Sequence, residues 1–302
     1  IITGNSAANK LIGGSGNDIL NGGLGNDHLI GGLGRDTALF SARSNRINLS
    51  SSARQNTGDG MDILTGIENV DGGPGNDTIT GNSAANKLIG GNGNDSLNGG
   101  LGNDLLVGGT GIDTALFSAR ANRINLSSRA RQNTGDGIDI LRLIENVNGG
   151  GGNDIITGNS AANKLIGGSG NDKLTGMAGE DIIYGQSGND ILIGGGQHDL
   201  LYGGAGADKL IGQAGDDILY GGAGNDLLRG GEGNDIFLIN KGPGRDLITD
   251  YDNDYDSIEL IGGLTGNDLT FDFIGGHTRI SNVDGDLLAI VQNTIADDLI
   301  FI

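Results

Sequence analysis

Aspartate recurs at a fixed spacing along most of the 302-residue chain. From Gly203 the sequence reads GGAGADKLI, GQAGDDILY, GGAGNDLLR and GGEGNDIFL, a strict period of nine residues. Written as G-G-x-G-x-D-x-U-x, where U is apolar, this register accounts for 19 units, and 16 of them carry aspartate at the sixth position. These aspartates are Asp18, Asp27, Asp36, Asp77, Asp95, Asp104, Asp113, Asp154, Asp172, Asp181, Asp190, Asp199, Asp208, Asp217, Asp226 and Asp235. Carboxylates beside exposed carbonyl oxygens are the ligands that a hard divalent cation prefers.

Glycine at positions one, two and four of each unit predicts an open turn, because glycine adopts positive φ at little steric cost. The three residues x-U-x then predict a short strand in which only the apolar side chain faces inward. Two units, 18 residues, return the chain to the same edge about 4.8 Å further along the axis. The pattern therefore predicts an all-β fold, a right-handed parallel β-roll with one column of Leu and Ile inside each sheet.

Stacked aspartates repel one another in such a roll. At roughly 5 Å and an effective dielectric constant near 20, each neighbouring pair costs about 3 kcal/mol before screening by solvent. A divalent cation between successive turns reverses the sign, and Ca²⁺ suits carbonyl cages better than Mg²⁺ does. Aspartate is also a common turn residue, but turn preference alone does not hold glycine and aspartate to a single nine-residue register.

The pattern G-G-x-G-x-D-x-U-x resembles the RTX (repeats-in-toxin, haemolysin-type) calcium-binding repeats. The resemblance implies several Ca²⁺ ions, each bound by carbonyls one and three and the aspartate of one turn. Carbonyls two and four and the aspartate of the next turn on that edge complete the set. On this sequence, the resemblance places one ion among Gly203, Gly204, Gly206, Asp208, Gly221, Gly222, Gly224 and Asp226.

Some units depart from the pattern. The GNSAAN turns end at Asn9, Asn86 and Asn163, which lack the carboxylate, and we expect them to stay open without an ion. Met177 replaces the second glycine before Asp181, and Gln197 replaces the fourth glycine before Asp199. We expect weak or vacant sites at those two turns.

A longer repeat of 77 residues lies over the short one, since the segment 5–81 recurs as 82–158. Each copy contains an interruption of the glycine period, at 37–76 and 114–153, whose short apolar runs predict added strands. We therefore expect a roll over 1–236 with two β excursions, followed by a C-terminal β segment over 237–302. The chain opens in mid-strand, as expected of the tail of a longer polypeptide.

The C-terminal segment contains an acid-rich stretch, GRDLITDYDNDYDSIEL. It resembles the segment that closes many RTX rolls, which implies a last ion at Asp246, Asp250 and Asp256; a solvated acidic loop is the alternative. The final residues 297–302 resemble the C-terminal export signal of type I secretion substrates, and a closing strand is compatible with that interpretation.

Composition excludes several classes of function. The net charge is −20 and the pI is near 4.2, which disfavours nucleic acids and anionic membranes as partners. Cysteine is absent, no apolar run is long enough to span a bilayer, and no catalytic motif is present. His28, His198 and His277 stand singly, as surface residues do.

The outward positions seven and nine carry Ile182/Tyr184, Leu200/Tyr202 and Ile218/Tyr220 at 18-residue intervals. This apolar stripe predicts either a cross-strand ladder or contact with the C-terminal segment, a preceding domain or a second copy.

The resemblance and the charge together predict an extracellular module without catalytic residues, which folds on Ca²⁺ and supports type I secretion of a larger protein. Two alternatives remain at this stage. One is an adhesive or fibrous surface protein whose length comes from the 77-residue repeats, and the other is the tail of a secreted hydrolase or epimerase.

Overall fold

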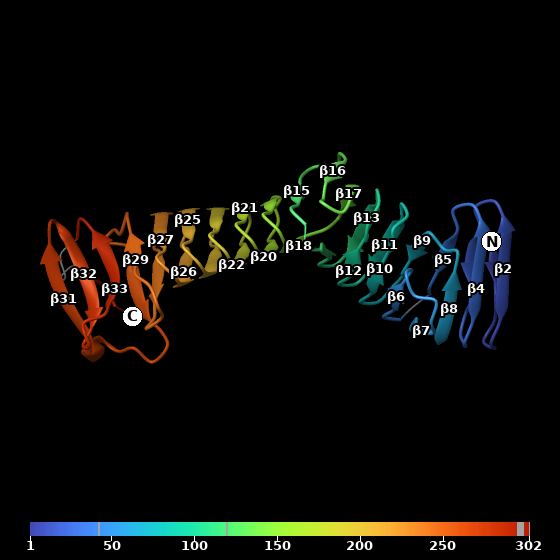
Figure 1. The fold of residues 1–302 in the computed structure, drawn as a ribbon, viewed down its shortest axis with the longest axis horizontal. Helices are drawn as coiled ribbons and strands as arrows, with labels where there is room; N and C mark the ends of the chain where they lie inside the picture. Colours follow the sequence, from blue (N-terminus) through green and yellow to red (C-terminus); the bar gives the residue numbers. More distant parts are fainter. Residues whose placement is uncertain (42, 119, 295–298, 302) are drawn as a thin grey trace. The chain divides into compact units, whose positions relative to one another are not determined.

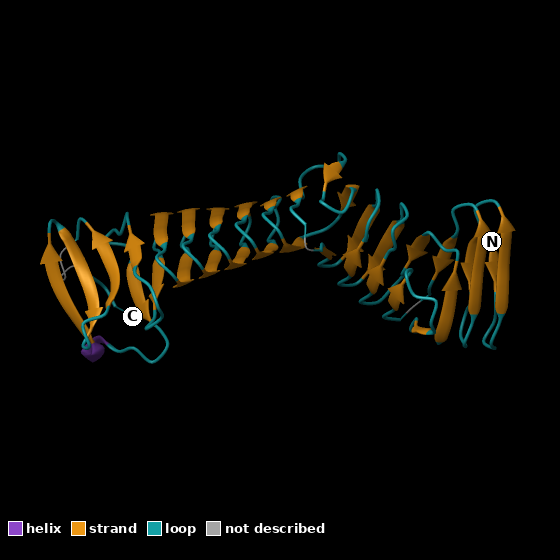
Figure 2. Cartoon of the chain, viewed as in Figure 1, coloured by secondary structure: helices purple, strands orange, loops and turns teal. Residues whose placement is uncertain are grey.

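The computed structural model describes residues 1–302 apart from residues 42, 119, 295–298 and 302. Almost all regular structure in this part of the chain is β-strand, with one short 3₁₀ helix (Figure 2). The chain divides into two compact units, Ile1–Asn148 and Gly149–Ile302. The all-β parallel roll expected from the nine-residue period is confirmed in each unit (Figure 1).

Unit 1 contains short strands that alternate between opposing sheets. They are β1 (Ile2–Thr3), β2 (Lys10–Ser15), β3 (Ile19–Asn21), β4 (His28–Leu33), β5 (Thr37–Leu39), β6 (Arg46–Asn48), β7 (Gln55–Asn56), β8 (Met61–Thr65), β9 (Asn69–Asp71), β10 (Thr78–Thr80), β11 (Lys87–Asn92), β12 (Ser96–Asn98), β13 (Leu105–Thr110), β14 (Thr114–Leu116), β15 (Arg123–Asn125), β16 (Gln132–Asn133) and β17 (Ile138–Arg142). One sheet has the order β1-β3-β5-β9-β11-β13-β17-β16; across the core lie β2-β4-β8-β7 and β14-β12-β10-β6.

Unit 2 begins within β18 (Asn146–Gly151) and repeats the same alternation more regularly. Its further strands are β19 (Ile155–Thr157), β20 (Lys164–Ser169), β21 (Lys173–Ala178), β22 (Ile182–Ser187), β23 (Ile191–Gly196), β24 (Leu200–Ala205), β25 (Lys209–Ala214), β26 (Ile218–Ala223), β27 (Leu227–Glu232), β28 (Ile236–Ile239), β29 (Asp246–Ile248), β30 (Ser257–Leu260), β31 (Leu269–Ile274), β32 (His277–Asn282) and β33 (Leu287–Gln292), and the 3₁₀ helix is Gly266–Asp268. The orders are β30-β28-β26-β24-β22-β20 and β19-β21-β23-β25-β27-β29-β33-β32-β31.

Parallel pairing follows an 18-residue register, as two nine-residue units require. Leu201 pairs with Leu219, and Leu210 pairs with Leu228. The eighth-position side chains are buried, and the last of them, Phe237, pairs with the buried Ile258 of the next strand. The core is therefore one side chain deep, as the strand pattern predicts.

The interruptions at 37–76 and 114–153 contain strands that pair within the roll. In the first, β6 lies parallel to β10, while β8 forms a hairpin with β7 and lies parallel to β4. The flanking strands β5 and β9 still pair, with Thr37 opposite Asn69, an offset of 32 residues. The second interruption has the same offset, between Thr114 and Asn146. Each interruption thus adds strands without breaking the stack.

The C-terminal segment continues the roll before it changes pattern. Strands β28, β29 and β30 keep parallel partners, whereas β31, β32 and β33 form an antiparallel meander. The domain boundary at 236/237 stays a prediction. Within the described residues, no helix has the length and apolar character needed to cross a membrane.

Candidate metal centres

The turns between strands are shaped by glycines that have no room for a side chain. Gly204 and Gly206 have φ of 115° and 133°, which disfavours any residue with a Cβ. Gly203 lacks positive φ, but a Cβ there would lie 2.4 Å from Oδ2 of Asp208 and 2.5 Å from the carbonyl oxygen of Gly221. A carboxylate oxygen and the carbonyl oxygen of the next turn thus converge beside this glycine.

The sixth-position aspartates form columns along each edge of the roll. The backbone N–H of Asp190 donates to Oδ1 of Asp208 at 2.8 Å, and Asp208 donates in the same way to Asp226. On the other edge, Asp199 donates to Asp217, and Asp217 donates to Asp235. One carboxylate oxygen per aspartate is therefore fixed by the turn that precedes it by 18 residues.

The second oxygen of these carboxylates is buried and has no hydrogen-bond partner. This holds for Oδ2 of the 15 sixth-position aspartates other than Asp154. Leaving a buried acceptor unsatisfied costs about 1–3 kcal/mol, and more for a charged group. These oxygens, several of which lie beside the carbonyl oxygen of the next turn, match the oxygen donors that Ca²⁺ takes. The residues present therefore fit the ions that the sequence predicts.

These sites need few carboxylates each. Among the described residues, no group of three or more His, Asp or Glu side chains forms a metal cluster. Backbone carbonyls must supply the remaining ligands, as the glycine-rich turns allow.

Comparison with known families decides the kind of repeat. The RTX calcium-binding nonapeptide repeat matches residues 3–38, 62–91, 80–115, 144–174, 166–201 and 202–237, more than half of the chain. The chain belongs to the RTX family. The repeats are calcium-binding repeats, so Ca²⁺ is the cofactor, as expected from the sequence.

Two solved structures are similar to this RTX chain. The extracellular lipase LipA of Serratia marcescens is 17% identical, with 80% of this chain and 43% of the lipase covered and a TM-score of 0.24. The AlgE6R3 subunit of the Azotobacter vinelandii mannuronan C5-epimerase is 21% identical, with 49% and 77% covered and a TM-score of 0.21. The chain thus spans less than half the length of the lipase. A search of curated protein sequences found no match.

The columns of RTX aspartates end on acidic residues that the nine-residue pattern does not contain. The backbone N–H groups of Asp27 and Asp104 donate to Oδ1 of Asp62 and of Asp139, respectively, both at 2.7 Å. The backbone N–H groups of Asp36 and Asp113 donate to Oε2 of Glu68 and of Glu145, respectively, both at 2.9 Å. These four residues lie in the interruptions, and sequence reasoning missed them.

A local signal for these four residues exists. Asp62 stands two residues before the buried Leu64, and Glu68 stands two residues before the buried Val70. The acid-x-apolar-x strand is therefore retained in the interruption after the glycine turn is lost.

Asparagine stands where four of the columns begin, at the sixth position of three nine-residue units and, for Asn45, inside the first interruption. The backbone N–H groups of Asn9, Asn45, Asn86 and Asn163 donate to the first aspartates of these columns. In the GNSAAN turns, Oδ1 of Asn86 accepts from the backbone N–H of Asn82 at 2.8 Å. The same bond joins Asn159 and Asn163 at 2.7 Å. This bond supports the expectation that these turns stay open without an ion, which remains a prediction.

Four turns of unit 2 carry a side chain where the pattern has glycine. Met177 and Gln197, expected from the sequence, have φ of 93° and 77°, and Gln186 and Gln213 have φ of 78° and 87°. The left-handed region costs roughly 1–2 kcal/mol for a residue with a Cβ. The turn is therefore kept in shape by its neighbours at these positions; reduced ion occupancy at the first two stays a prediction.

The acid-rich stretch is divided between the two edges of the roll. Oδ1 of Asp246 accepts from the backbone N–H of Asp226, and Oδ1 of Asp256 accepts from the backbone N–H of Asp235. These two residues therefore extend separate columns. Asp250 accepts from the backbone of Gly230 and pairs with Arg229. A last ion shared by Asp246, Asp250 and Asp256 stays a prediction. The predicted export signal at 297–302 lies in part outside the described residues.

Burial raises the pKa of many column carboxyls in unit 2, and neighbouring carboxylates raise it further at several of them. The pKa reaches about 7 for Asp208 and Asp217, whose neighbours include Asp226 and Asp235. Burial, followed by the charge of Asp226, raises the pKa of Asp246 to about 8. Keeping these carboxylates ionised in the metal-free roll therefore costs free energy. Binding a proton or a cation at these oxygens removes that cost.

Proposed function

We propose that this RTX chain is a calcium-triggered folding module of a secreted bacterial protein. The observation that carries the proposal is the set of 15 buried, unpartnered Oδ2 atoms. At neutral pH without metal, these carboxylates repel one another along each edge of the roll, and a core one side chain deep does not offset that repulsion. Calcium bound between turns removes that repulsion, so folding and ion binding occur together.

Such a coupling suits export through a narrow channel. Extracellular calcium modules bind in the 10⁻⁴–10⁻³ M range, far above cytosolic calcium, so the chain stays unfolded inside the cell and folds outside. We propose type I secretion, extracellular localisation and a supporting, non-catalytic role on this basis. The net charge of −20 keeps the unfolded chain extended and soluble.

The test compares the full chain in chelator, in Mg²⁺ and in Ca²⁺ at neutral pH. We expect a β spectrum by far-UV circular dichroism in millimolar Ca²⁺ only. In chelator, small-angle scattering should give a radius of gyration near the unfolded value of about 60 Å for this length. A full β spectrum in chelator at neutral pH would refute the proposal.

The tyrosine stripe is a second surface for which the sequence left two interpretations. Tyr184 and Tyr202 stack with ring centroids 5.0 Å apart, and Tyr202 meets Tyr220 edge-on at 6.0 Å. The amide of Asn240 donates to the hydroxyl of Tyr220. These contacts support a ladder that touches the C-terminal segment. Association with a second copy or a preceding domain stays a prediction, tested by sedimentation of Tyr202→Lys.

A further inference from the structure

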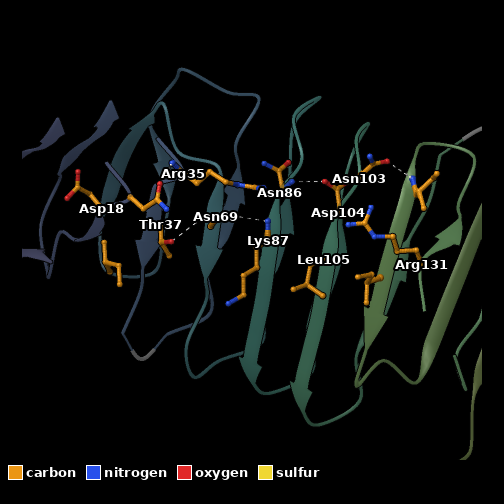
Figure 3. A pocket seen from close by; sticks show the side chains of 14 residues that line it. Asp18, Arg35, Thr37, Asn69, Asn86, Lys87, Asn103, Asp104, Leu105 and Arg131 are labelled. Carbon is orange, nitrogen blue, oxygen red and sulfur yellow. Dashed lines mark hydrogen bonds between the residues drawn. The ribbon is translucent and has the colours of Figure 1, made fainter. Parts of the chain in front are cut away.

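An open groove of about 530 Å³ lies on the outer face of unit 1 (Figure 3). Its floor is a row of outward side chains on β3, β5, β9, β11, β13 and β17, which includes Thr37, Asn69 and Lys87. Thr37 is paired with Asn69, and Asn69 with Lys87, so the row crosses the strands at right angles. Five strand spacings give the row a length of about 24 Å. That length suits an extended polymer better than a small metabolite.

Three basic side chains line this groove, although the chain as a whole is acidic. Arg35, Lys87 and Arg131 all line it and are exposed. Arg35 also donates to the carbonyl oxygen of Ala85, which holds its guanidinium at the rim. Arginine presents planar pairs of donors that match carboxylate or sulfate groups. The groove therefore offers an anionic polymer three positive contacts.

Asparagine side chains line the groove together with these basic residues. Oδ1 of Asn17 accepts from the backbone of Arg35, and Oδ1 of Asn103 accepts from the backbone of Ile138, both at 2.9 Å. These bonds fix the two side chains through their oxygens, which leaves their Nδ2 groups as donors in the lining of the groove. Asn103 is labelled in Figure 3. Such amides bind hydroxyl or carboxylate oxygens.

When the columns of unit 1 hold calcium, the charge of the residues outside the columns is positive. Residues 1–148 contain 11 Lys and Arg and 14 Asp and Glu. Eleven of the acids are in the columns, and only Asp59, Asp71 and Asp136 are not. Asp18 and Asp104, which flank the groove, belong to columns. This step rests on the proposed calcium function, because the ions neutralise the acids that compete for Arg35 and Arg131.

We propose that this groove binds a linear acidic polysaccharide, whose carboxylate or sulfate groups pair with Arg35, Lys87 and Arg131. The lining residues include no aromatic side chain, and single-stranded nucleic acids depend on aromatic stacking for much of their affinity. A hydroxyl-rich chain with regularly spaced anions uses the arginines and the asparagine amides together.

The test measures binding of hyaluronan oligosaccharides to the full chain by calorimetry in millimolar Ca²⁺ at low and moderate salt. The variant Arg35→Gln with Arg131→Gln should bind about five- to tenfold more weakly, with a shallower salt dependence. The matched control is Arg46→Gln with Arg123→Gln, which removes the same charge from exposed positions that do not line the groove. The control should bind within twofold of the parent.

Three outcomes would contradict the proposal that the groove binds an acidic polysaccharide. They are equal losses in both double variants, no binding at low salt by a chain that folds with calcium, or tighter binding of single-stranded DNA of equal charge that displaces the saccharide. Circular dichroism of every variant separates the two proposals. If the chain binds hyaluronan and is already folded in chelator, the groove proposal stands and the proposal of calcium-triggered folding is refuted.

Discussion

The backbone N–H of Asp199 donates to Oδ1 of Asp217 at 2.8 Å, while Oδ2 of Asp217 is buried without a partner. One half of the carboxylate is thus used by the protein, and the other half faces the carbonyl-lined turn. The same division at the other aspartates whose Oδ1 accepts from a preceding turn, such as Asp208, Asp226 and Asp235, makes the column both a structural element and a row of candidate ion sites.

Removing one carboxylate from a column should weaken calcium-driven folding. Asp217→Asn keeps the hydrogen bond to the backbone of Asp199 but removes the charge that a cation requires. We expect the Ca²⁺ midpoint of folding, followed by circular dichroism, to rise several-fold. Asp216→Asn is the matched control, because Asp216 is adjacent, exposed and outside the column. Equal shifts in the two variants would show that net charge alone governs folding.

A methyl group at the first glycine of a turn should block the site. Gly203→Ala places a Cβ 2.4 Å from Oδ2 of Asp208 and 2.5 Å from the carbonyl oxygen of Gly221. We expect a loss of about 3 kcal/mol in Ca²⁺, the upper end for overpacking, measured by chemical unfolding. Gly196→Ala should change little, since its nearest atom is 4.0 Å away. An unaffected Gly203→Ala would mean that the turn opens freely.

Glycine should stabilise the turns that carry a side chain at positive φ. Gln213 has φ of 87°, so Gln213→Gly removes backbone strain of roughly 1–2 kcal/mol and adds chain entropy to the unfolded state. We expect a net gain of about 0.5–1 kcal/mol in calcium, seen as a higher Tm. Ala214→Gly, next to it and without positive φ, should lower Tm. A lower Tm for Gln213→Gly would indicate that the glutamine makes a contact worth more than its strain.

The sequence predicts the regular columns almost completely, because a nine-residue period fixes strand register, burial and the edge on which each aspartate lies. Asp62 and Glu68 escape that logic, since their offsets from Asp27 and Asp36 are 35 and 32 residues rather than 18. The interruption hides the register because its strands are offset by lengths other than 18 residues, and only the pairing of β8 with β4 and of β9 with β5 restores it. Gln186 and Gln213 replace the second glycine of their units just as Met177 does, so the sequence carries the same signal for them.

Acid should partly replace calcium. The pKa of Asp217 is raised to about 7 and that of Asp190 to about 6, mainly by burial, whereas aspartate in an unfolded chain has a pKa near 3.9. The metal-free native state therefore binds more protons than the unfolded state, so its stability falls as pH rises. This contribution is fully present near pH 4 and is lost as pH rises through about 6 to 7.

In chelator, we therefore expect β structure to appear as pH is lowered from 8 to 5, followed by circular dichroism. In Ca²⁺, the midpoint of folding should rise over the same interval, because protons compete with the ion for the same oxygens. Asp217→Asn should take up fewer protons on folding and show a smaller pH effect than Asp216→Asn. A metal-free chain that gains no β structure between pH 8 and pH 5 would contradict the raised pKa values.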